Sequence, residues 1–299
     1  MFDKIICTVM TPAYNRGYKI LDLYKSLQNQ TNKNFEWVVV DDGSTDNTED
    51  LFKKILKDKN DFEIFYYKIE NGGKHRAINY ALDKVKGKFF FIVDSDDKLP
   101  KKSIEIIFKW FKTIEGKNNY AGIGGLRRYE NTEKIIGKTF KEEFIDCTSL
   151  ERNKFNILGD KAEVFYTEVL KKYKFPTFEN EKFLSEAVVW NKIAREGLKI
   201  RWFNEVTYEG NYLEDGLTKN LENHYKKSPK GFALYLKSLD LNNERYKKLR
   251  FYKKYGYYCS TIKNLSIEEI AKEFNAKKYE IYLGCFIYKT YEILKKLFK

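Results

Sequence analysis

Three carboxylates and one hydroxyl follow each other at the end of an apolar run, in the residues Asp94, Ser95, Asp96 and Asp97. Residues 89–93 before them read Phe-Phe-Phe-Ile-Val, which is typical of a fully buried strand. Two carboxylates on either side of one residue can bind a hard cation such as Mg²⁺ or Mn²⁺, which takes further ligands from water and phosphate. A nucleoside diphosphate bound to that cation becomes a better leaving group. The segment therefore predicts a metal and nucleotide site, although Asp and Ser are also common in plain turns.

A second strand pattern also ends in carboxylates. Residues 38–48 read Val-Val-Val-Asp-Asp-Gly-Ser-Thr-Asp-Asn-Thr, so Asp41 and Asp42 stand at a strand end. A carboxylate there can accept the imide N–H of uracil or the hydroxyls of a ribose. The segment also fits a turn at Asp42-Gly43 followed by a helix cap at 44–46, with Thr45 or Asp46 as the capping residue. The two interpretations are compatible.

Two loops supply further polar groups. Residues 11–16, Thr-Pro-Ala-Tyr-Asn-Arg, end the first apolar run, and residues 71–79, Asn-Gly-Gly-Lys-His-Arg-Ala-Ile-Asn, place Lys74 near a helix start. A helix start is a natural neighbour for phosphate, because its N–H groups are unpaired. Neither loop is a G-x-x-x-x-G-K-[ST] or G-x-G-x-x-G motif, which argues against ATPase and dinucleotide chemistry.

These segments sit in an alternating pattern of apolar strands and amphipathic helices. Strands are predicted at 4–11, 36–42, 62–68 and 88–93, with helices over 18–30, from 45 or 46 onward, and over 77–85. This order predicts an α/β fold with a mostly parallel central sheet flanked by helices. Right-handed crossovers bring the carboxyl ends of the strands to one edge, where such sheets bind their ligands. Thr11, Asp41, Asp42, Asp94 and Asp96 therefore converge on one crevice.

The pattern loosens after residue 116 and changes after residue 217. Residues 119–129 and 197–210 read as strands, and residues 184–196 as a helix. We predict a catalytic domain over 1–218, with a donor half at about 1–100 and an acceptor half at about 101–218. Residues 219–299 form a basic, mainly helical C-terminal extension.

Composition excludes several classes of protein. The 4 cysteines form no C-x-x-C pair, and with 2 histidines no zinc spacing is present. No secretory signal precedes the first strand, and no apolar stretch approaches the roughly 20 residues that span a bilayer. These features predict a cytoplasmic protein with reduced thiols.

The net charge of +13 is concentrated in the C-terminal extension. Residues 245–254 are rich in Lys and Arg, and residues 279–299 carry apolar side chains at helical spacing, at Tyr282, Phe286, Ile287, Tyr291, Leu294 and Phe298. Such a helix can lie in a membrane interface, which would place the protein at the inner face of the cell membrane. The apolar face can equally pack on the catalytic domain or on a second subunit. A solvated lysine-rich surface and a nucleic-acid partner are further alternatives, and the oligomeric state stays open.

The four segments, in this order, resemble the family 2 glycosyltransferases, which have the GT-A fold. That family shows P-x-Y-N after its first strand, then V-V-D-D-G-S-x-D-x-T, N-x-G-x-x-x-A-x-N and D-x-D-D. The third motif has slightly altered spacing in this chain. The matching residues are Pro12, Tyr14 and Asn15, then 38–48, then Asn71, Gly72, Gly73, Ala77 and Asn79, and finally 94–97. The resemblance spans about residues 4–100 and continues more weakly to about 215.

The resemblance implies an inverting transfer of a sugar from a nucleotide sugar, most often a UDP-sugar, to a saccharide or lipid-linked saccharide, in surface polysaccharide or glycoconjugate assembly. The residues that it implies for the nucleotide sugar are Thr11, Pro12, Tyr14, Asp41, Asp42, Lys74, Asp94 and Ser95. It implies Mn²⁺ or Mg²⁺ as the cofactor, with Asp96 as a ligand and Asp94 and His224 as further candidates. The general base matches Glu186, with Glu181 as the second choice, at the start of the helix predicted over 184–196.

Two other classes of protein stay open at this stage. A sugar nucleotidyltransferase is also an α/β nucleotide binder, but it usually carries a glycine- and arginine-rich loop after the first strand, which residues 11–19 lack. A non-catalytic carbohydrate- or nucleic-acid-binding protein would explain the basic and aromatic residues at 245–258. The acidic crevice disfavours a polyanion at that edge, so we expect no nucleic-acid partner.

Overall fold

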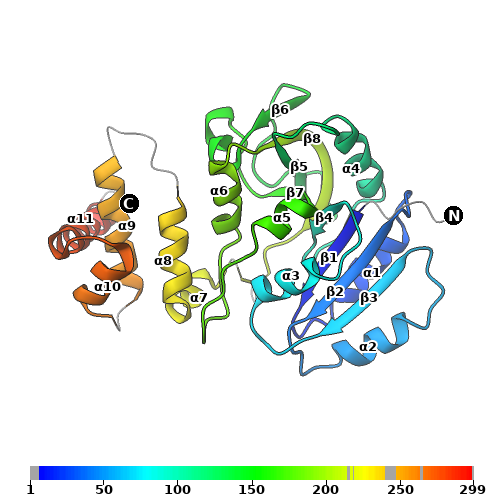
Figure 1. Cartoon of the computed structure of the whole chain (residues 1–299), viewed down its shortest axis with the longest axis horizontal. Helices are drawn as coiled ribbons and strands as arrows, with labels where there is room; N and C mark the ends of the chain where they lie inside the picture. Colours follow the sequence, from blue (N-terminus) through cyan, green and yellow to red (C-terminus); the bar gives the residue numbers. More distant parts are fainter. Residues whose placement is uncertain (1–6, 214–215, 218, 240–246, 263–264, 298–299) are drawn as a thin grey trace. The chain divides into compact units, whose positions relative to one another are not determined.

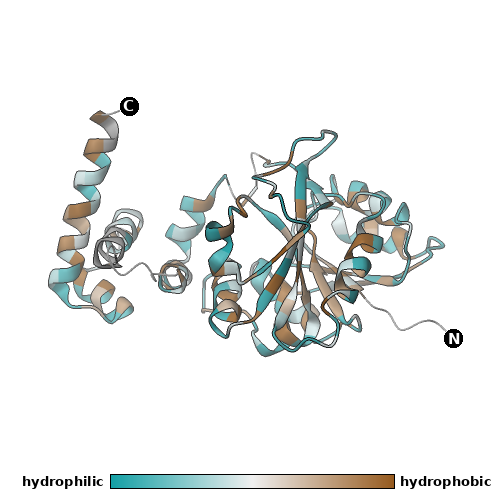
Figure 2. Cartoon of the chain, turned by 90° about the horizontal axis from the view of Figure 1, so that it is seen from above, coloured by the Kyte–Doolittle hydropathy of each residue, from teal (hydrophilic) through white to brown (hydrophobic). Residues whose placement is uncertain are grey.

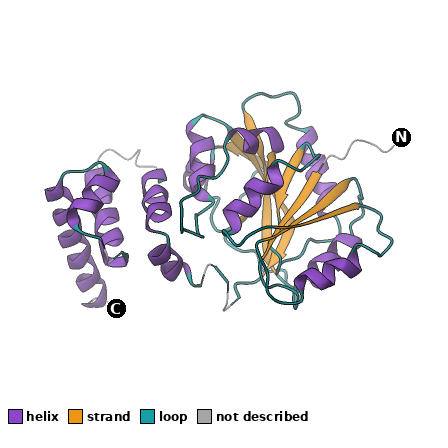
Figure 3. Cartoon of the chain, turned by 60° about the horizontal axis from the view of Figure 1, so that its bottom comes forward, coloured by secondary structure: helices purple, strands orange, loops and turns teal. Residues whose placement is uncertain are grey.

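A computed structural model describes residues 7–213, 216–217, 219–239, 247–262 and 265–297 (Figure 1). The chain forms two compact units, Met1–Phe175 with Lys192–Tyr212 and Pro176–Asn191 with Leu213–Lys299. The first unit contains the sheet, and the second consists of helices and loops in the described residues (Figure 3).

One eight-stranded sheet forms the centre of the first unit, in the order β3-β2-β1-β4-β7-β5-β8-β6. The strands are β1 (Cys7–Ala13), β2 (Phe35–Asp41), β3 (Glu63–Lys68), β4 (Phe89–Ile92), β5 (Tyr120–Tyr129), β6 (Phe144–Cys147), β7 (Lys161–Tyr166) and β8 (Lys199–Gly210). The first four strands of the sheet are parallel, as the alternating pattern predicts. Strand β7 runs antiparallel between β4 and β5, and β8 pairs parallel with β5. The α/β prediction with a mostly parallel sheet is thus confirmed.

Helices cover both faces of this sheet (Figure 1). They are α1 (Ile20–Gln28), α2 (Thr48–Ile55), α3 (Lys74–Leu82), α4 (Ser103–Lys112) and α5 (Thr167–Lys172), with a 3₁₀ helix at Ser149–Phe155. Helix α6 (Ala187–Arg195) crosses the division between the two units. The main core lies between the sheet and the amphipathic faces of α1, α2 and α4, around Trp37, Phe52, Phe91 and Phe111.

Several element bounds differ from the sequence prediction. Helix α2 begins at Thr48, and the Asp46 carboxylate, one of the two predicted caps, accepts the Thr48 N–H at 3.0 Å. The same carboxylate accepts the Gly17 N–H at 3.1 Å. Helix α3 begins three residues before the predicted start, directly after Gly73. Residues 4–6 of the first predicted strand lie outside the described residues.

The second unit holds the C-terminal helices α7 (Leu221–Lys227), α8 (Pro229–Ser238), α9 (Lys247–Thr261), α10 (Ile267–Phe274) and α11 (Lys278–Leu297). The helical extension predicted over 219–299 is therefore present. Its own core is built around Phe232, Tyr258 and Ile281, so the unit has an apolar centre independent of the sheet. None of the helices in the described ranges combines the length and apolar character needed to cross a membrane.

Candidate active site

The Asp94–Asp97 turn directly follows strand β4 and lies at the carboxyl end of the parallel half of the sheet. Its first carboxylate accepts a charged hydrogen bond from Lys74 Nζ at 2.5 Å, and Lys74 is the first residue of α3. Burial acts to raise the pKa of Asp94, but the positive charges of Lys74 and Arg127 hold it below its usual value. Asp94 therefore stays ionised in a largely buried place.

The last residue of the turn is held from the other half of the sheet. The Asp97 carboxylate accepts hydrogen bonds from Arg127 Nη2 at 2.9 Å and from the Tyr208 hydroxyl at 2.7 Å. The same Tyr208 hydroxyl accepts the Asp94 N–H at 2.9 Å, so one oxygen ties both ends of the turn together. Strand β8 comes so close at Gly210 that a Cβ there would lie 2.1 Å from Asp97 Oδ1. Tyr208 and Arg127 thus fix the shape of the turn.

Asp96 is the carboxylate of the turn with room for a ligand. It is partly exposed, and among the described residues no other residue donates a hydrogen bond to its carboxylate. Burial and the neighbouring charge of Asp94 raise its pKa above the usual value, although the positive charges of Arg16 and Lys74 act in the opposite direction. A divalent cation would supply further positive charge, so the residues present fit one.

The protein part of such a metal site is small. Among the residues that the structure describes, no group of three or more His, Cys, Asp or Glu side chains could hold a metal ion. Asp94 and Asp96 can offer two carboxylates at most, and the remaining ligands would come from water and phosphate, as is usual for Mg²⁺. The buried Ser95 lies between them.

The two carboxylates at the end of β2 accept hydrogen bonds from neighbouring loops and strands. Asp41 is buried and accepts the Ser44 N–H at 2.7 Å, together with the hydroxyl of Tyr66. Asp42 accepts the N–H groups of Gly72 at 2.7 Å and Gly73 at 2.8 Å. Both carboxylates therefore hold loops of the crevice in place, and Asp42 joins the end of β2 to the start of α3.

Gly43 permits this close approach between the two loops. Its φ is +77°, which L side chains rarely adopt, and a Cβ there would lie 2.9 Å from the Asn71 N atom. The side-chain amide of Asn71 donates to the Asp42 carbonyl at 2.7 Å and to its carboxylate at 3.1 Å. The motif residues of the two loops thus interlock.

The end of β1 and the loop after it present their side chains in different directions. The Thr11 hydroxyl is fully buried and accepts the Trp37 indole N–H at 3.0 Å, so it faces the core. Pro12 is half-buried, and Tyr14 is 48% exposed. The positive charge of Arg16 helps to lower the pKa of Asp94 and partly offsets the rise in the pKa of Asp96, so Arg16 lies near both carboxylates.

The three remaining predicted residues belong to the second unit. Glu186 lies directly before α6 and is half-buried, and its carbonyl accepts the Trp190 N–H at 3.1 Å. The Glu181 carboxylate is buried and accepts the N–H groups of Lys230 at 2.9 Å and Gly231 at 2.8 Å, at the start of α8. The ring of His224 on α7 stacks on Phe183 with 5.2 Å between centroids. The predicted roles of these three residues stay predictions.

Sequence reasoning missed Arg16, Arg127 and Tyr208. Arg16 follows the first strand in the same loop as Tyr14, and a basic residue beside an acidic strand end was a usable signal. Arg127 and Tyr208 lie more than 30 and 110 residues after the turn, and no spacing rule connects them to it. Only the pairing of β5 with β8, which sets Arg127 beside Tyr208, reveals their place.

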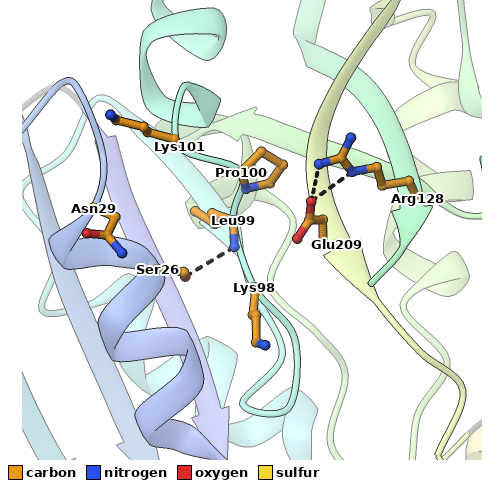
Figure 4. Close-up of a pocket in the computed structure, with 8 residues that line it drawn as sticks. All are labelled: Ser26, Asn29, Lys98, Leu99, Pro100, Lys101, Arg128 and Glu209. Atoms are coloured by element: carbon orange, nitrogen blue, oxygen red, sulfur yellow. Dashed lines mark hydrogen bonds and ion pairs between the residues drawn. The ribbon is translucent and has the colours of Figure 1, made fainter. Parts of the chain in front are cut away.

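A separate cavity of about 410 Å³ lies beside the loop that leaves the turn (Figure 4). It is lined by Ser26, Asn29, Lys98, Leu99, Pro100, Lys101, Arg128 and Glu209. Its polar groups largely pair with each other, since Arg128 Nε donates to Glu209 at 2.7 Å and the Leu99 N–H donates to Ser26 at 3.2 Å. None of the predicted site residues lines this cavity, so it is distinct from the acidic crevice.

Comparison with known proteins finds glycosyltransferases among the relatives of this chain. The sequence profile of the family described as Glycosyl transferase family 2 matches residues 8–165. A putative teichuronic acid biosynthesis glycosyltransferase, TuaG of Bacillus subtilis, is 35% identical, over 73% of this chain and 83% of that protein. A GalNAc(5)-diNAcBac-PP-undecaprenol beta-1,3-glucosyltransferase of Campylobacter jejuni is 26% identical, over 63% of this chain and 60% of that protein. Several other curated relatives are longer, and the chain spans about a quarter or less of their length.

The fold has solved counterparts as well. The crystal structure of Staphylococcus aureus TarS, residues 1–349, in complex with UDP-GlcNAc superimposes with a TM-score of 0.64. The two share 18% sequence identity, over 96% of this chain and 91% of that one. At this identity the likeness concerns the fold, and the predicted GT-A-type architecture is confirmed.

Proposed function

This chain belongs to glycosyl transferase family 2, and from this premise we propose that it transfers a sugar from a nucleoside diphosphate sugar to a hydroxyl group. The observation that carries the proposal is the Asp94–Asp97 turn. Asp94 and Asp97 are held by hydrogen bonds, whereas the Asp96 carboxylate remains available for a ligand. A site that only stabilised the fold would have paired this half-buried carboxylate as well, because burying an unpaired charge is costly.

The donor in this proposal is a UDP-sugar. Asp42 and Asn71 join the loop after β2 to the start of α3. Their backbone and side-chain groups would contact the base and ribose, beside Pro12 and Tyr14. The TarS structure was determined in complex with UDP-GlcNAc, which supports uridine as the base. We propose further that the transferred sugar is a hexose.

Asp96 would hold Mn²⁺ or Mg²⁺, with Asp94 as a second carboxylate. When bound, such a cation neutralises charge on the diphosphate and makes it a better leaving group. His224 is a further candidate ligand, and only the resemblance of the sequence to the family supports it.

Three cations of this chain surround the carboxylates. Lys74 and Arg127 hold the pKa of Asp94 low, and Arg16 acts on Asp94 and Asp96. A diphosphate brought into this crevice would meet their positive charge at short range, and fixed charges cost little reorganisation when the leaving group departs. Lys74 is the best placed, because it is the first residue of α3 and its ammonium group already contacts Asp94.

The general base in this proposal is Glu186. The Glu181 carboxylate already accepts two N–H groups at the start of α8, so its oxygens are occupied in holding that helix start. Glu186 precedes α6 and is partly exposed, which a base that must meet a substrate hydroxyl requires. One displacement assisted by this base would invert the anomeric carbon.

The acceptor is proposed to be a saccharide or a lipid-linked saccharide, in the assembly of a surface polysaccharide or glycoconjugate. The name of TuaG refers to teichuronic acid biosynthesis, and that of the Campylobacter relative to an undecaprenol-linked acceptor, which support this class. We propose that residues 1–218 form the catalytic domain with its donor and acceptor halves, and that the protein works at the cytoplasmic face of the membrane.

The experiment that tests this function measures release of UDP from UDP-sugars in the presence of saccharide and lipid-linked acceptors, with and without Mn²⁺. We expect release that depends on both Mn²⁺ and acceptor. Formation of a nucleotide sugar from UTP and a sugar phosphate would instead identify a nucleotidyltransferase. Binding of saccharides without any turnover of a nucleotide sugar would identify a non-catalytic binding protein.

A further inference from the structure

Helix α11 packs into the second unit by one narrow face. Ile281 on that face is fully buried. A Cβ at Gly256 of α9 would lie 2.3 Å from the Gly284 carbonyl oxygen and 2.2 Å from the Tyr288 Cβ, so the two helices meet almost backbone to backbone. This contact fixes which face of α11 is used inside the protein.

The opposite face of α11 carries an apolar stripe that is open to solvent and is interrupted in its middle by the exposed Thr290. We call it the α11 stripe, and it consists of Tyr279, Tyr282, Leu283, Phe286, Ile293, Leu294 and Leu297, each at least 40% exposed. Counted from Tyr279, these positions are 3, 4, 7, 14, 15 and 18 residues along, which places them on one side of a helix with about 3.6 residues per turn. In Figure 2, where the ribbon is coloured by hydropathy, hydrophobic segments recur along this helix.

The stripe is too long to be ordinary surface scatter. At about 1.5 Å per residue, Tyr279 to Leu297 span about 27 Å. Its two most exposed members are Phe286 at 69% and Leu297 at 74%. Exposed apolar surface that extends over several turns is typical of an interaction site.

The sequence assigned the apolar face slightly differently. Tyr282, Phe286 and Leu294 are on the stripe as predicted, and Phe298 lies outside the described residues. Ile287 is only partly exposed, and Tyr291 lies to one side of the stripe by helical spacing. Apolar residues occur on both faces of α11, and only the packing against α9 reveals which face remains open.

Lys289 is exposed and lies beside the stripe, about 80° from the line through Tyr279. Lys278 and Glu280 lie about 100° away on opposite flanks, and Lys278 pairs with Glu268 of α10 at 2.6 Å. No acidic residue of the helix lies within the stripe, and the positive charge comes mainly from the unit as a whole. Residues 219–299 contain 19 Lys and Arg against 8 Asp and Glu, which is a net charge of +11.

We propose that the α11 stripe docks the protein on an anionic lipid surface, with the helix lying in the interface instead of crossing the bilayer. An apolar face beside lysines is the pattern of interfacial helices, and Tyr279 and Tyr282 suit the headgroup level because their rings are apolar and their hydroxyls polar. A second copy of this chain is a poorer occupant, because two strongly basic units would repel each other. The inference does not depend on the proposed sugar transfer.

Sedimentation with vesicles tests this inference on the full chain. One set contains equal parts of phosphatidylglycerol and phosphatidylcholine, and the other phosphatidylcholine alone. We expect the wild-type protein to bind the first set and to bind less as salt rises, because salt screens the lysines. The double variant Phe286→Gln/Leu294→Gln should bind at least about tenfold more weakly, because each side chain loses its apolar transfer into the interface.

A matched control separates the stripe from general surface polarity. Phe155 and Leu56 are similarly exposed, at 44% and 49%, and belong to the first unit. The double variant Phe155→Gln/Leu56→Gln makes the same chemical change there and should bind the anionic vesicles as the wild type does. Circular dichroism and thermal unfolding should show that both variants are folded.

Three outcomes would overturn the proposal. The first is equal binding by the wild-type protein and the folded stripe variant, and the second is no wild-type binding to the anionic vesicles. The third is a wild-type dimer in analytical ultracentrifugation that becomes monomeric in the stripe variant, since a second copy would then cover the stripe.

Discussion

Replacing Tyr208 by Phe should loosen the Asp94–Asp97 turn while leaving the surrounding packing intact. The change removes only the hydroxyl, which accepts the Asp94 N–H at 2.9 Å and donates to the Asp97 carboxylate at 2.7 Å. The ring keeps its edge contact with Phe91 and its place under the Arg127 guanidinium, 3.9 Å from the ring centroid. Any effect of the variant therefore reports on two hydrogen bonds.

Those two bonds set the size of the effect. The Asp97 carboxylate is buried and keeps Arg127 as a partner, whereas the Asp94 N–H is left without one. One lost bond to a charged group and one unpaired N–H together correspond to about 2–4 kcal/mol of unfolding free energy. For a unit of this size, Tm should fall by about 2–4 °C for each kcal/mol. Metal affinity should fall by about 10–100-fold, which is typical when a partner that positions a ligand is lost.

Tyr120→Phe is the matched control. The Tyr120 hydroxyl donates to Asp146 at 2.8 Å and accepts from Arg201 at 3.3 Å, at the opposite end of β5 from Arg127. It should lose comparable stability, measured by urea unfolding, and bind Mn²⁺ in calorimetry as the wild type does. Tyr208→Phe with wild-type stability would refute the account, and so would equal loss of Mn²⁺ affinity in both variants.

Three further predictions concern the chemistry. Burial and the charge of Asp94 raise the pKa of Asp96, and metal binding requires the ionised carboxylate. The affinity for Mn²⁺ should therefore rise with pH as Asp96 loses its proton. An affinity that does not change with pH in the acid range would contradict this prediction. Glu186→Gln should lower kcat by roughly 10²–10⁴ with little change in donor binding, whereas Glu181→Gln should mainly destabilise α8; the reverse result would make Glu181 the base. An α-linked nucleotide sugar should give a β-linked product in NMR coupling constants, and retention would exclude a single displacement.

The parallel half of the fold could be predicted because each of its strands is a continuous apolar run that ends at a turn signal. The acid at each strand end was also visible, since Asp41 and Asp94 follow such runs directly. Strand β7 was not predicted, because it lies outside the regular alternation of parallel strands and helices. Its residues were assigned only to the acceptor half at about 101–218. Helix α4 was missed although Ile104, Ile107 and Trp110 show helical spacing.

The contacts that shape the site could not be predicted from the sequence, because they depend on how segments far apart in the chain meet. Asp42 could be recognised as a polar strand end, but its acceptance of two glycine N–H groups depends on how two loops meet. Tyr208 reaches the turn only because β8 adds to the sheet beside β5. Glu181 resembled a base because acidic residues are common near helix starts, and its bonds to the start of α8 became visible only in the folded chain.

Calorimetric titration of UDP into the protein, with Mn²⁺ present or with excess chelator, tests the central claim most directly. We predict one binding site that requires Mn²⁺, that is lost in Asp96→Asn, and that is kept in the control Asp50→Asn, whose carboxylate is exposed on α2. UDP binding that is equally tight in chelator, or unchanged in a folded Asp96→Asn variant, would contradict a metal-dependent nucleotide site at the Asp94–Asp97 turn.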